Sequence, residues 1–254
     1  MSSESVHLRL AGITRLSLNG RGPRDAYVFD PHRLALSSWA LGLESRPPAL
    51  LLTFDRHMDL VAPTGPVPDV SVGVLALDAF VRQSLDVRNV DHILAAMDAG
   101  LLTDAWVFAR SHPRGAVQGP EWTDTRGRTH RLTRMPRLAP LLEDYDAPAP
   151  GSLAADFKAA LAQHEDVVLD LDLDCFTTPN DADPDVLLSW TREMIRDFLC
   201  PPGSEVFWDA VLAKTRVLTL AREPHHCGGL IAAGRLFEEL AHVLFRELLQ
   251  VDLP

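Results

Sequence analysis

The sequence has little of several features that would define a class of protein. It contains only three cysteines, Cys175, Cys200 and Cys227, which lack the paired spacing of a zinc ribbon or a disulfide scaffold. No stretch approaches the roughly 20 apolar residues of a transmembrane helix. The first residues also lack the basic and then apolar order of a secretory signal. We therefore expect a cytoplasmic protein with no membrane partner.

Lysine is scarce as well. The 24 basic residues include only two lysines, Lys158 and Lys214, against 35 acidic residues, and the net charge is −11. Such a surface repels nucleic acid and attracts cations. No nucleic-acid partner is expected, and the composition does not indicate an oligomeric state.

The chain does have the length and pattern of one α/β domain over residues 1–254, with 46% hydrophobic residues. Strands are predicted at residues 26–29, 49–54, 105–109, 167–173 and 216–221, and helices at residues 32–43, 90–99, 152–164, 185–199 and 228–249. This alternation builds a mostly parallel sheet with helices on both faces. We predict a three-layer α/β/α fold.

Two stretches rich in proline and glycine, residues 62–70 and 112–150, interrupt this alternation. Long irregular segments inside compact domains are usually functional loops, and loops at the carboxyl ends of parallel strands form the ligand crevice. We expect both stretches to be irregular loops of this kind.

Two acidic clusters belong to apolar, strand-like runs. One contains Asp55, His57 and Asp59, and the other contains Asp170, Asp172 and Asp174. If each run continues as a strand, the side chains of a cluster point to one face, because alternate residues share a face.

Buried carboxylates need a compensating charge, and with so few lysines divalent metal is the simplest source. Mixed oxygen and nitrogen ligands favour Mn²⁺, Fe²⁺ or Zn²⁺, and a pair of such ions supports hydrolysis. A solvated edge strand or a calcium loop is the structural alternative, but the glycine and bidentate glutamate of an EF-hand are absent.

The clusters resemble motifs of the ureohydrolase superfamily, which includes arginases and agmatinases. Residues 55–59, Asp-Arg-His-Met-Asp, resemble the motif Asp-Ala-His-X-Asp, and residues 169–174 resemble Ser-Phe-Asp-X-Asp. The order of motifs is most similar to the peptide arginase branch, which also carries elements like residues 30–32, Asp-Pro-His, and residues 220–224, Leu-Ala-Arg-Glu-Pro. The resemblance implies an arginase-like fold and two Mn²⁺ ions, with Fe²⁺ or Zn²⁺ as alternatives.

The resemblance also implies the metal ligands. They are His32, Asp55, His57, Asp59, Asp172 and Asp174, with Asp55 bridging both ions. In the second motif the register is open, because a shift of two residues makes Asp170 a ligand. We prefer Asp172 and Asp174, which lie nearer the carboxyl end of the strand, and assign Asp170 to orienting a ligand.

Roles in substrate binding and proton transfer follow from position. Glu223 matches the acid that pairs with guanidinium in arginases, although it could instead pair with Arg222 or cap the last helix. His225 and His226 are the preferred proton donors, ahead of His112. Asp91 and His92, at the start of a helix near the predicted crevice, are candidate substrate contacts.

The sequence departs from ordinary arginases. Arg56 replaces a small residue, Cys175-Phe176 replaces Asp-Pro, and the loop that grips the α-groups of free arginine is not recognisable. We therefore expect an arginine-containing peptide as substrate, converted to ornithine with release of urea. A deacetylase-like amidohydrolase on the same fold and a non-catalytic, metal-stabilised binding protein are the alternative functions.

Overall fold

The computed structural model describes residues 8–44, 46, 48–111 and 114–251. Its centre is an eight-stranded sheet with the order β1-β2-β10-β7-β3-β4-β6-β5. The strands are β1 (Thr14–Ser17), β2 (Asp25–Phe29), β3 (Ala49–Phe54), β4 (Leu102–Phe108), β5 (Glu121–Thr123), β6 (Thr129–Met135), β7 (Val167–Asp172) and β10 (Thr215–Ala221). The inner strands from β2 to β6 are parallel, and only the edge strands β1 and β5 pair antiparallel. The carboxyl ends of the inner strands therefore meet along one edge.

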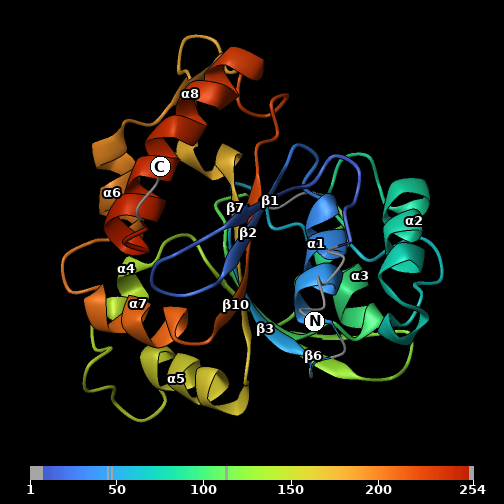
Figure 1. The fold of residues 1–254 in the computed structure, drawn as a ribbon. Helices are drawn as coiled ribbons and strands as arrows, with labels where there is room; N and C mark the ends of the chain where they lie inside the picture. The colour runs from blue at the N-terminus through green and yellow to red at the C-terminus, as the bar shows by residue number, and fades with distance from the viewer. Residues whose placement is uncertain (1–7, 45, 47, 112–113, 252–254) are drawn as a thin grey trace, which may run out of the picture.

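Helices cover both faces of this sheet (Figure 1). One face carries α1 (Leu34–Leu43), α2 (Val74–Ser84) and α3 (His92–Ala99), and the other carries α4 (Ala139–Leu142), α5 (Leu153–Gln163), α6 (Arg192–Leu199), α7 (Glu205–Leu212) and α8 (Leu230–Ala241). Short helical segments are η1 (Val70–Val72), η2 (Leu173–Phe176) and the π-helical η3 (His242–Leu248). The predicted three-layer α/β/α fold with a mostly parallel sheet is confirmed.

Strand β3 shows why the sheet lies in the middle. All six of its residues are buried. Leu50, Leu52 and Phe54 belong to the core beneath the α5–α8 face, whereas Ala49 and Leu51 belong to the core beneath α1 and α3. Alternate side chains point to opposite faces, so a strand covered on both sides is apolar except where a polar group such as the hydroxyl of Thr53 has a buried partner.

The helix predicted over residues 185–199 begins too early. Residues 187–189 instead form strand β9 (Leu187–Ser189), which pairs antiparallel with β8 (Thr177–Pro179). Helix α6 starts at Arg192, because the hydroxyl of Thr191 accepts a hydrogen bond from the backbone N–H of Met194 and caps the helix.

The expectation of an irregular loop over residues 112–150 is also wrong. The stretch contains the β5–β6 hairpin, whose strand β6 extends the main sheet beside β4, and helix α4. Residues 62–70 do lack a strand or α-helix. His112 lies outside the described residues.

All three cysteines are free, with Cys175 and Cys227 buried. Among the described residues, no helix combines the length and the apolar character needed to cross a membrane.

The β5–β6 hairpin depends on Asp124. Its carboxylate accepts backbone N–H bonds from Arg126 (2.9 Å) and Arg128 (2.8 Å), and side-chain bonds from Arg128 Nε (2.6 Å) and His130 Nε2 (3.1 Å). Burial opposes ionisation of Asp124, but these donors outweigh it and lower the pKa to about 2. The ionised carboxylate of Asp124 therefore stabilises the turn of the β5–β6 hairpin.

We expect Asp124→Asn to reduce the free energy of unfolding by roughly 1–2 kcal/mol at neutral pH. Because the folded-state pKa lies below the usual value of about 4, the stabilisation is complete above that pH and is lost as the pH falls towards 2. Urea denaturation of both proteins at pH 7 and pH 3 measures this. A difference that is no smaller at pH 3 would contradict the role of the ionised carboxylate.

Candidate metal centre

The predicted metal ligands gather at the carboxyl ends of neighbouring parallel strands. His32 follows β2, the segment from Asp55 to Asp59 follows β3, and Asp172 and Asp174 lie at the end of β7. Glu223 follows β10, which lies between β2 and β7. Because the carboxyl ends of neighbouring parallel strands lie at the same edge of the sheet, residues that are distant in the sequence meet in one crevice.

The local geometry differs from the predicted one-sided strands. Strand β3 ends at Phe54, and Asp59 has a left-handed backbone with φ of 44°. Strand β7 ends at Asp172, and Asp174 lies in the 3-10 helix η2, where its N–H donates to Asp172 Oδ1 (3.0 Å). The side chains are thus gathered by loop and 3-10 turns rather than by strand alternation.

His32 is at the centre of the cluster and is fully buried. Its Nδ1 lies 3.3 Å from Asp55 Oδ2, 3.3 Å from Asp59 Oδ2 and 3.0 Å from Asp172 Oδ2. Atoms that share one ion approach each other to about 3 Å, because each lies roughly 2.0–2.2 Å from the metal. His32, Asp55 and Asp172 offer atoms that all lie within 4.8 Å of one another, and His32, Asp59 and His92 form a second such group. We call His32, Asp55, Asp59 and Asp172 together the first position.

A buried polar strip orients His32. Asp170 pairs in register with Thr53 on β3 and Thr219 on β10. Both hydroxyls donate to the Asp170 carboxylate, at 2.8 Å from Thr53 and 2.5 Å from Thr219, and His32 Nε2 lies 2.9 Å from Asp170 Oδ2. With Nε2–H directed to Asp170, the lone pair of Nδ1 faces the three carboxylates of the first position.

A second position adjoins the first. Its ligand atoms come from Asp55, His57 and Asp174, and these atoms all lie within 4.8 Å of one another. His57 Nδ1 lies 3.0 Å from Asp174 Oδ2 and 3.8 Å from Asp55 Oδ1. Asp55 therefore belongs to both positions.

The buried atoms of the two positions fit a cation. His32 Nδ1 and Asp174 Oδ2 are buried and have no hydrogen-bond partner. Burial, and then the neighbouring carboxylates, raise the pKa of Asp55 and of Asp172 well above the usual range. Divalent ions held by these carboxylates and imidazoles offset that cost, and the mixed O/N donors suit Mn²⁺, Fe²⁺ or Zn²⁺.

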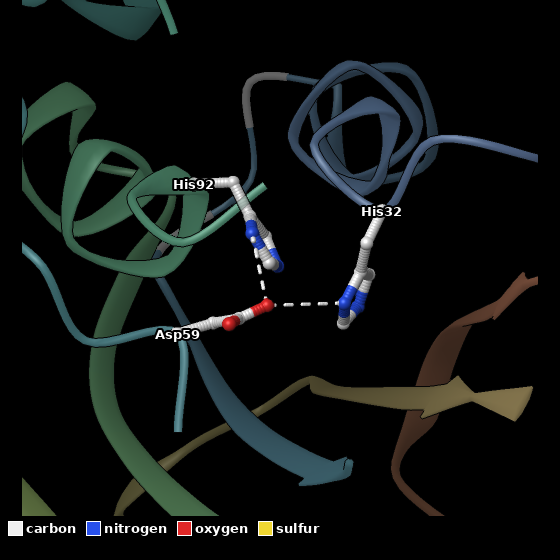
Figure 2. Close-up of side chains that lie close together, drawn as sticks. All are labelled: His32, Asp59 and His92. Carbon is white, nitrogen blue, oxygen red and sulfur yellow. Dashed lines mark ion pairs between the residues drawn. The ribbon is translucent and has the colours of Figure 1, made fainter. Parts of the chain in front are cut away.

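His92 lies against the first position (Figure 2). Its ring packs 4.3 Å from that of His32, and its Nδ1 lies 3.8 Å from Asp59 Oδ2 and 2.9 Å from the backbone oxygen of Asn89. Burial lowers the pKa of His92 to about 3, so the ring is neutral.

Asp91 is buried too, and both of its carboxylate oxygens accept the N–H of Asp86. Neither predicted substrate contact is among the described residues that line the pocket beside the cluster.

That pocket has a volume of about 520 Å³. It is lined by Asp30, Pro31, Arg33, Val87, Asn89, Glu223, Pro224, His225, His226, Gly229 and Leu230. The side chains of Glu223 and His226 also offer atoms within 4.8 Å of an Asp174 carboxylate oxygen, which joins the pocket to the second position. His226 Nε2 lies 3.7 Å from Glu223 Oε2.

Glu223 is held in place by neighbours. It is buried, its backbone is left-handed (φ 35°), and its Oε1 accepts the backbone N–H of His32 at 2.9 Å. The side-chain amide of Asn89 donates to the same oxygen, while Asn89 Oδ1 accepts from Arg33 Nη1 at 3.0 Å. Burial raises the pKa of Glu223. The neighbouring His32 acts in the opposite direction but offsets only part of this shift. These bonds fix Oε1 and direct Oε2 towards His226.

Sequence reasoning missed Asn89, Thr53 and Thr219. Asn89 has a left-handed backbone (φ 63°), a conformation that asparagine tolerates better than most residues, and its neighbours in the chain gave no other signal. Thr53 is the one hydroxyl residue of β3, and Thr219 is flanked by apolar residues in β10. Such a hydroxyl is a weak signal for a polar partner on the adjacent strand.

A scan against protein-family models and a search of curated proteins both return no match. Solved structures similar to this chain include three arginases. The arginase from Bacillus subtilis subsp. subtilis str. 168 is 15% identical with a TM-score of 0.44, over 84% of this chain and 68% of that chain. The arginase from Bacillus cereus is 14% identical (TM-score 0.39; 84% and 68%), and that from Helicobacter pylori is 10% identical (TM-score 0.42; 91% and 74%).

We expect Asp170→Asn to weaken Mn²⁺ binding roughly 10- to 100-fold, because an amide no longer fixes the tautomer of His32 as a carboxylate does. Isothermal titration with Mn²⁺ measures the effect. Asp166→Asn is the matched control. Asp166 immediately precedes the first residue of β7, at the end of the strand away from the metal centre, and it pairs with Arg46. Equal affinity of Asp170→Asn and the native protein would remove Asp170 from the metal centre.

Proposed function

We propose that the protein is a dinuclear metal-dependent hydrolase that acts on the guanidinium group of arginine in a peptide, releasing urea and leaving ornithine. The observation that carries the proposal is the meeting of two histidines and four aspartates in one cluster beside Glu223, in which every residue but the half-buried His57 is buried. Mn²⁺ is the proposed metal, with Fe²⁺ and Zn²⁺ as alternatives. When bound, the ions supply Lewis acidity that activates a water molecule for attack on carbon.

Glu223 is the proposed anchor for the guanidinium. It is buried at the junction of the pocket and the second position. Its Oε1 already accepts two hydrogen bonds, from the N–H of His32 and the amide of Asn89, and a carboxylate oxygen such as Oε2 has lone pairs to accept bonds from a guanidinium. Parallel bonds from a guanidinium to a carboxylate fix both the position and the plane of the group. A neutral amide such as acetyl-lysine has no cation for this carboxylate, which favours the guanidinium over the amidohydrolase alternative.

His226 is the favoured proton donor to the leaving amine. Its side chain is 44% exposed at the pocket, in contact with Glu223 and edge-on to the ring of His57 at 5.8 Å. An imidazole at such a boundary can exchange protons with solvent and deliver one to the substrate. His225 lines the same pocket and is the second candidate.

A peptide is favoured over free arginine by the pocket lining. Among the described lining residues, Arg33 is the only arginine or lysine, and its Nη1 is engaged by Asn89 Oδ1 and the backbone oxygen of Val87 (3.4 Å). A free amino acid needs a donor for its α-carboxylate, whereas an amide-linked residue does not.

Incubation of the Mn²⁺-loaded protein with arginine-containing peptides should release urea and lower the peptide mass by about 42 Da per arginine, the change from guanidine to amine. Glu223→Gln should reduce kcat/KM for the peptide by roughly 100-fold or more, because the charged pair with guanidinium is lost. Glu165→Gln, at an exposed side chain that pairs with Arg46, is the control. Loss of acetyl from acetyl-lysine peptides without urea would favour the amidohydrolase, and bound metal with neither product would favour a binding protein.

Asn89→Ala should raise KM for the peptide roughly tenfold and leave metal content unchanged, because Glu223 loses one of its two hydrogen-bond donors on Oε1. Steady-state kinetics together with elemental analysis test this. Asn180→Ala, in an exposed turn, is the control. A loss of metal together with activity would show that Asn89 supports the cluster as a whole instead of Glu223.

A further inference from the structure

We propose that the two metal positions have unequal affinity, with the first filled tightly and the second weakly, because the guanidinium of Arg56 neutralises Asp174 in the second position. The inference rests on the dinuclear centre of the proposed function, but it is independent of the substrate. It concerns a residue that lies between two ligands in the chain, since Arg56 stands between Asp55 and His57.

The ligands of the two positions carry different charge. In the first position, three carboxylates lie within 3.3 Å of His32 Nδ1. In the second position, His57 is accompanied by two carboxylates, Asp55 and Asp174, and Asp55 is shared with the first position. A third carboxylate near Asp174 is that of Glu223, but its Oε1 is held by the N–H of His32 and the amide of Asn89. An ion in the second position therefore has fewer carboxylates beside its histidine, and it competes for Asp55 with its neighbour.

Arg56 adds a fixed positive charge to the second position only. Its Nη2 lies 3.6 Å from Asp174 Oδ2, and its Nη1 donates to Thr177 Oγ1 at 3.2 Å. Among the described residues, no other arginine or lysine forms an ion pair with Asp55, Asp59, Asp172 or Asp174. A guanidinium stays charged at any physiological pH, so this charge cannot be titrated away.

The backbone around Arg56 is fixed as well. The N–H of Arg56 donates to Asp174 Oδ1 at 3.2 Å, and its carbonyl oxygen accepts from the N–H of Arg110 (3.2 Å), the N–H of Ser111 (2.9 Å) and the hydroxyl of Ser111 (2.8 Å). The side chain is 17% exposed. An ion that enters the second position therefore meets the guanidinium at close range.

Repulsion at this range is substantial. Charges about 4 Å apart near a protein surface interact far more strongly than in bulk water, and a divalent ion doubles the effect. We expect the second ion to bind roughly tenfold more weakly than the first, or weaker still. At low metal concentration the protein then holds one ion, with Arg56 supplying part of the charge that the second ion supplies at higher concentration.

The test is a titration of the chelator-treated protein with Mn²⁺, followed by calorimetry, with EPR to detect coupling between two bound ions. The native protein should bind in two steps separated by tenfold or more, and the coupled signal should arise only in the second step. Arg56→Gln should strengthen the second step by roughly tenfold and leave the first unchanged, whereas Arg56→Lys should keep the gap. His57→Ala should abolish the weak step, which assigns it to the second position.

Arg222→Gln is the matched control, because Arg222 pairs with Asp30 (2.8 Å) at the rim of the pocket and should leave both steps unchanged. Two equal steps in the native protein, or an unchanged gap in Arg56→Gln, would overturn the inference. Circular dichroism establishes that each variant is folded. Failure of the proposed function is separate, because it appears as absence of urea from protein with both positions filled.

Discussion

Negative charge in a buried crevice is the constraint on which the rest of this structure depends. Asp55, Asp59, Asp172, Asp174 and Glu223 lie together, each no more than 6% exposed. Carboxylates in such surroundings are stable only with cations or strong hydrogen-bond donors nearby. The described residues place His32, His57 and Arg56 beside these carboxylates, and in the proposed function metal ions balance the remaining charge.

The sheet is built to hold that charge. Parallel strands β2, β10, β7 and β3 place their carboxyl ends side by side, so one crevice receives ligands from distant parts of the chain. Below the crevice, Thr53, Asp170 and Thr219 form a polar strip across three neighbouring strands whose adjacent residues are apolar. The strip is buried, and its polar groups have hydrogen-bond partners. Asp170 in the strip orients the ring of His32 so that Nδ1 faces the carboxylates of the crevice. Core packing and ligand geometry are therefore parts of one arrangement.

Polar side chains around this crevice act in two ways, by hydrogen bonding to a neighbour or by charge. Asp170 and Asn89 each use a pair of opposed hydrogen bonds to hold another side chain, His32 in one case and Glu223 in the other. Arg56 acts by charge instead, beside Asp174. The residues that contact solvent in the pocket, such as His226, are attached to this rigid frame through Glu223.

The sequence by itself determined the layered fold, since strand and helix periods alternate and strands such as residues 49–54 are apolar at all but one position. It also indicated the acidic clusters as metal ligands, because isolated carboxylates beside apolar strands need a cation. It could not give the loop and 3-10 turns that carry Asp59 and Asp174, nor the hairpin held by Asp124. These depend on which nearby donors a carboxylate such as that of Asp172 or Asp124 accepts. Only the tertiary structure decided which atoms meet. Register between strands joins Asp170 to Thr53 and Thr219, and chain crossings bring Asn89 to Glu223, through contacts that no local pattern encodes.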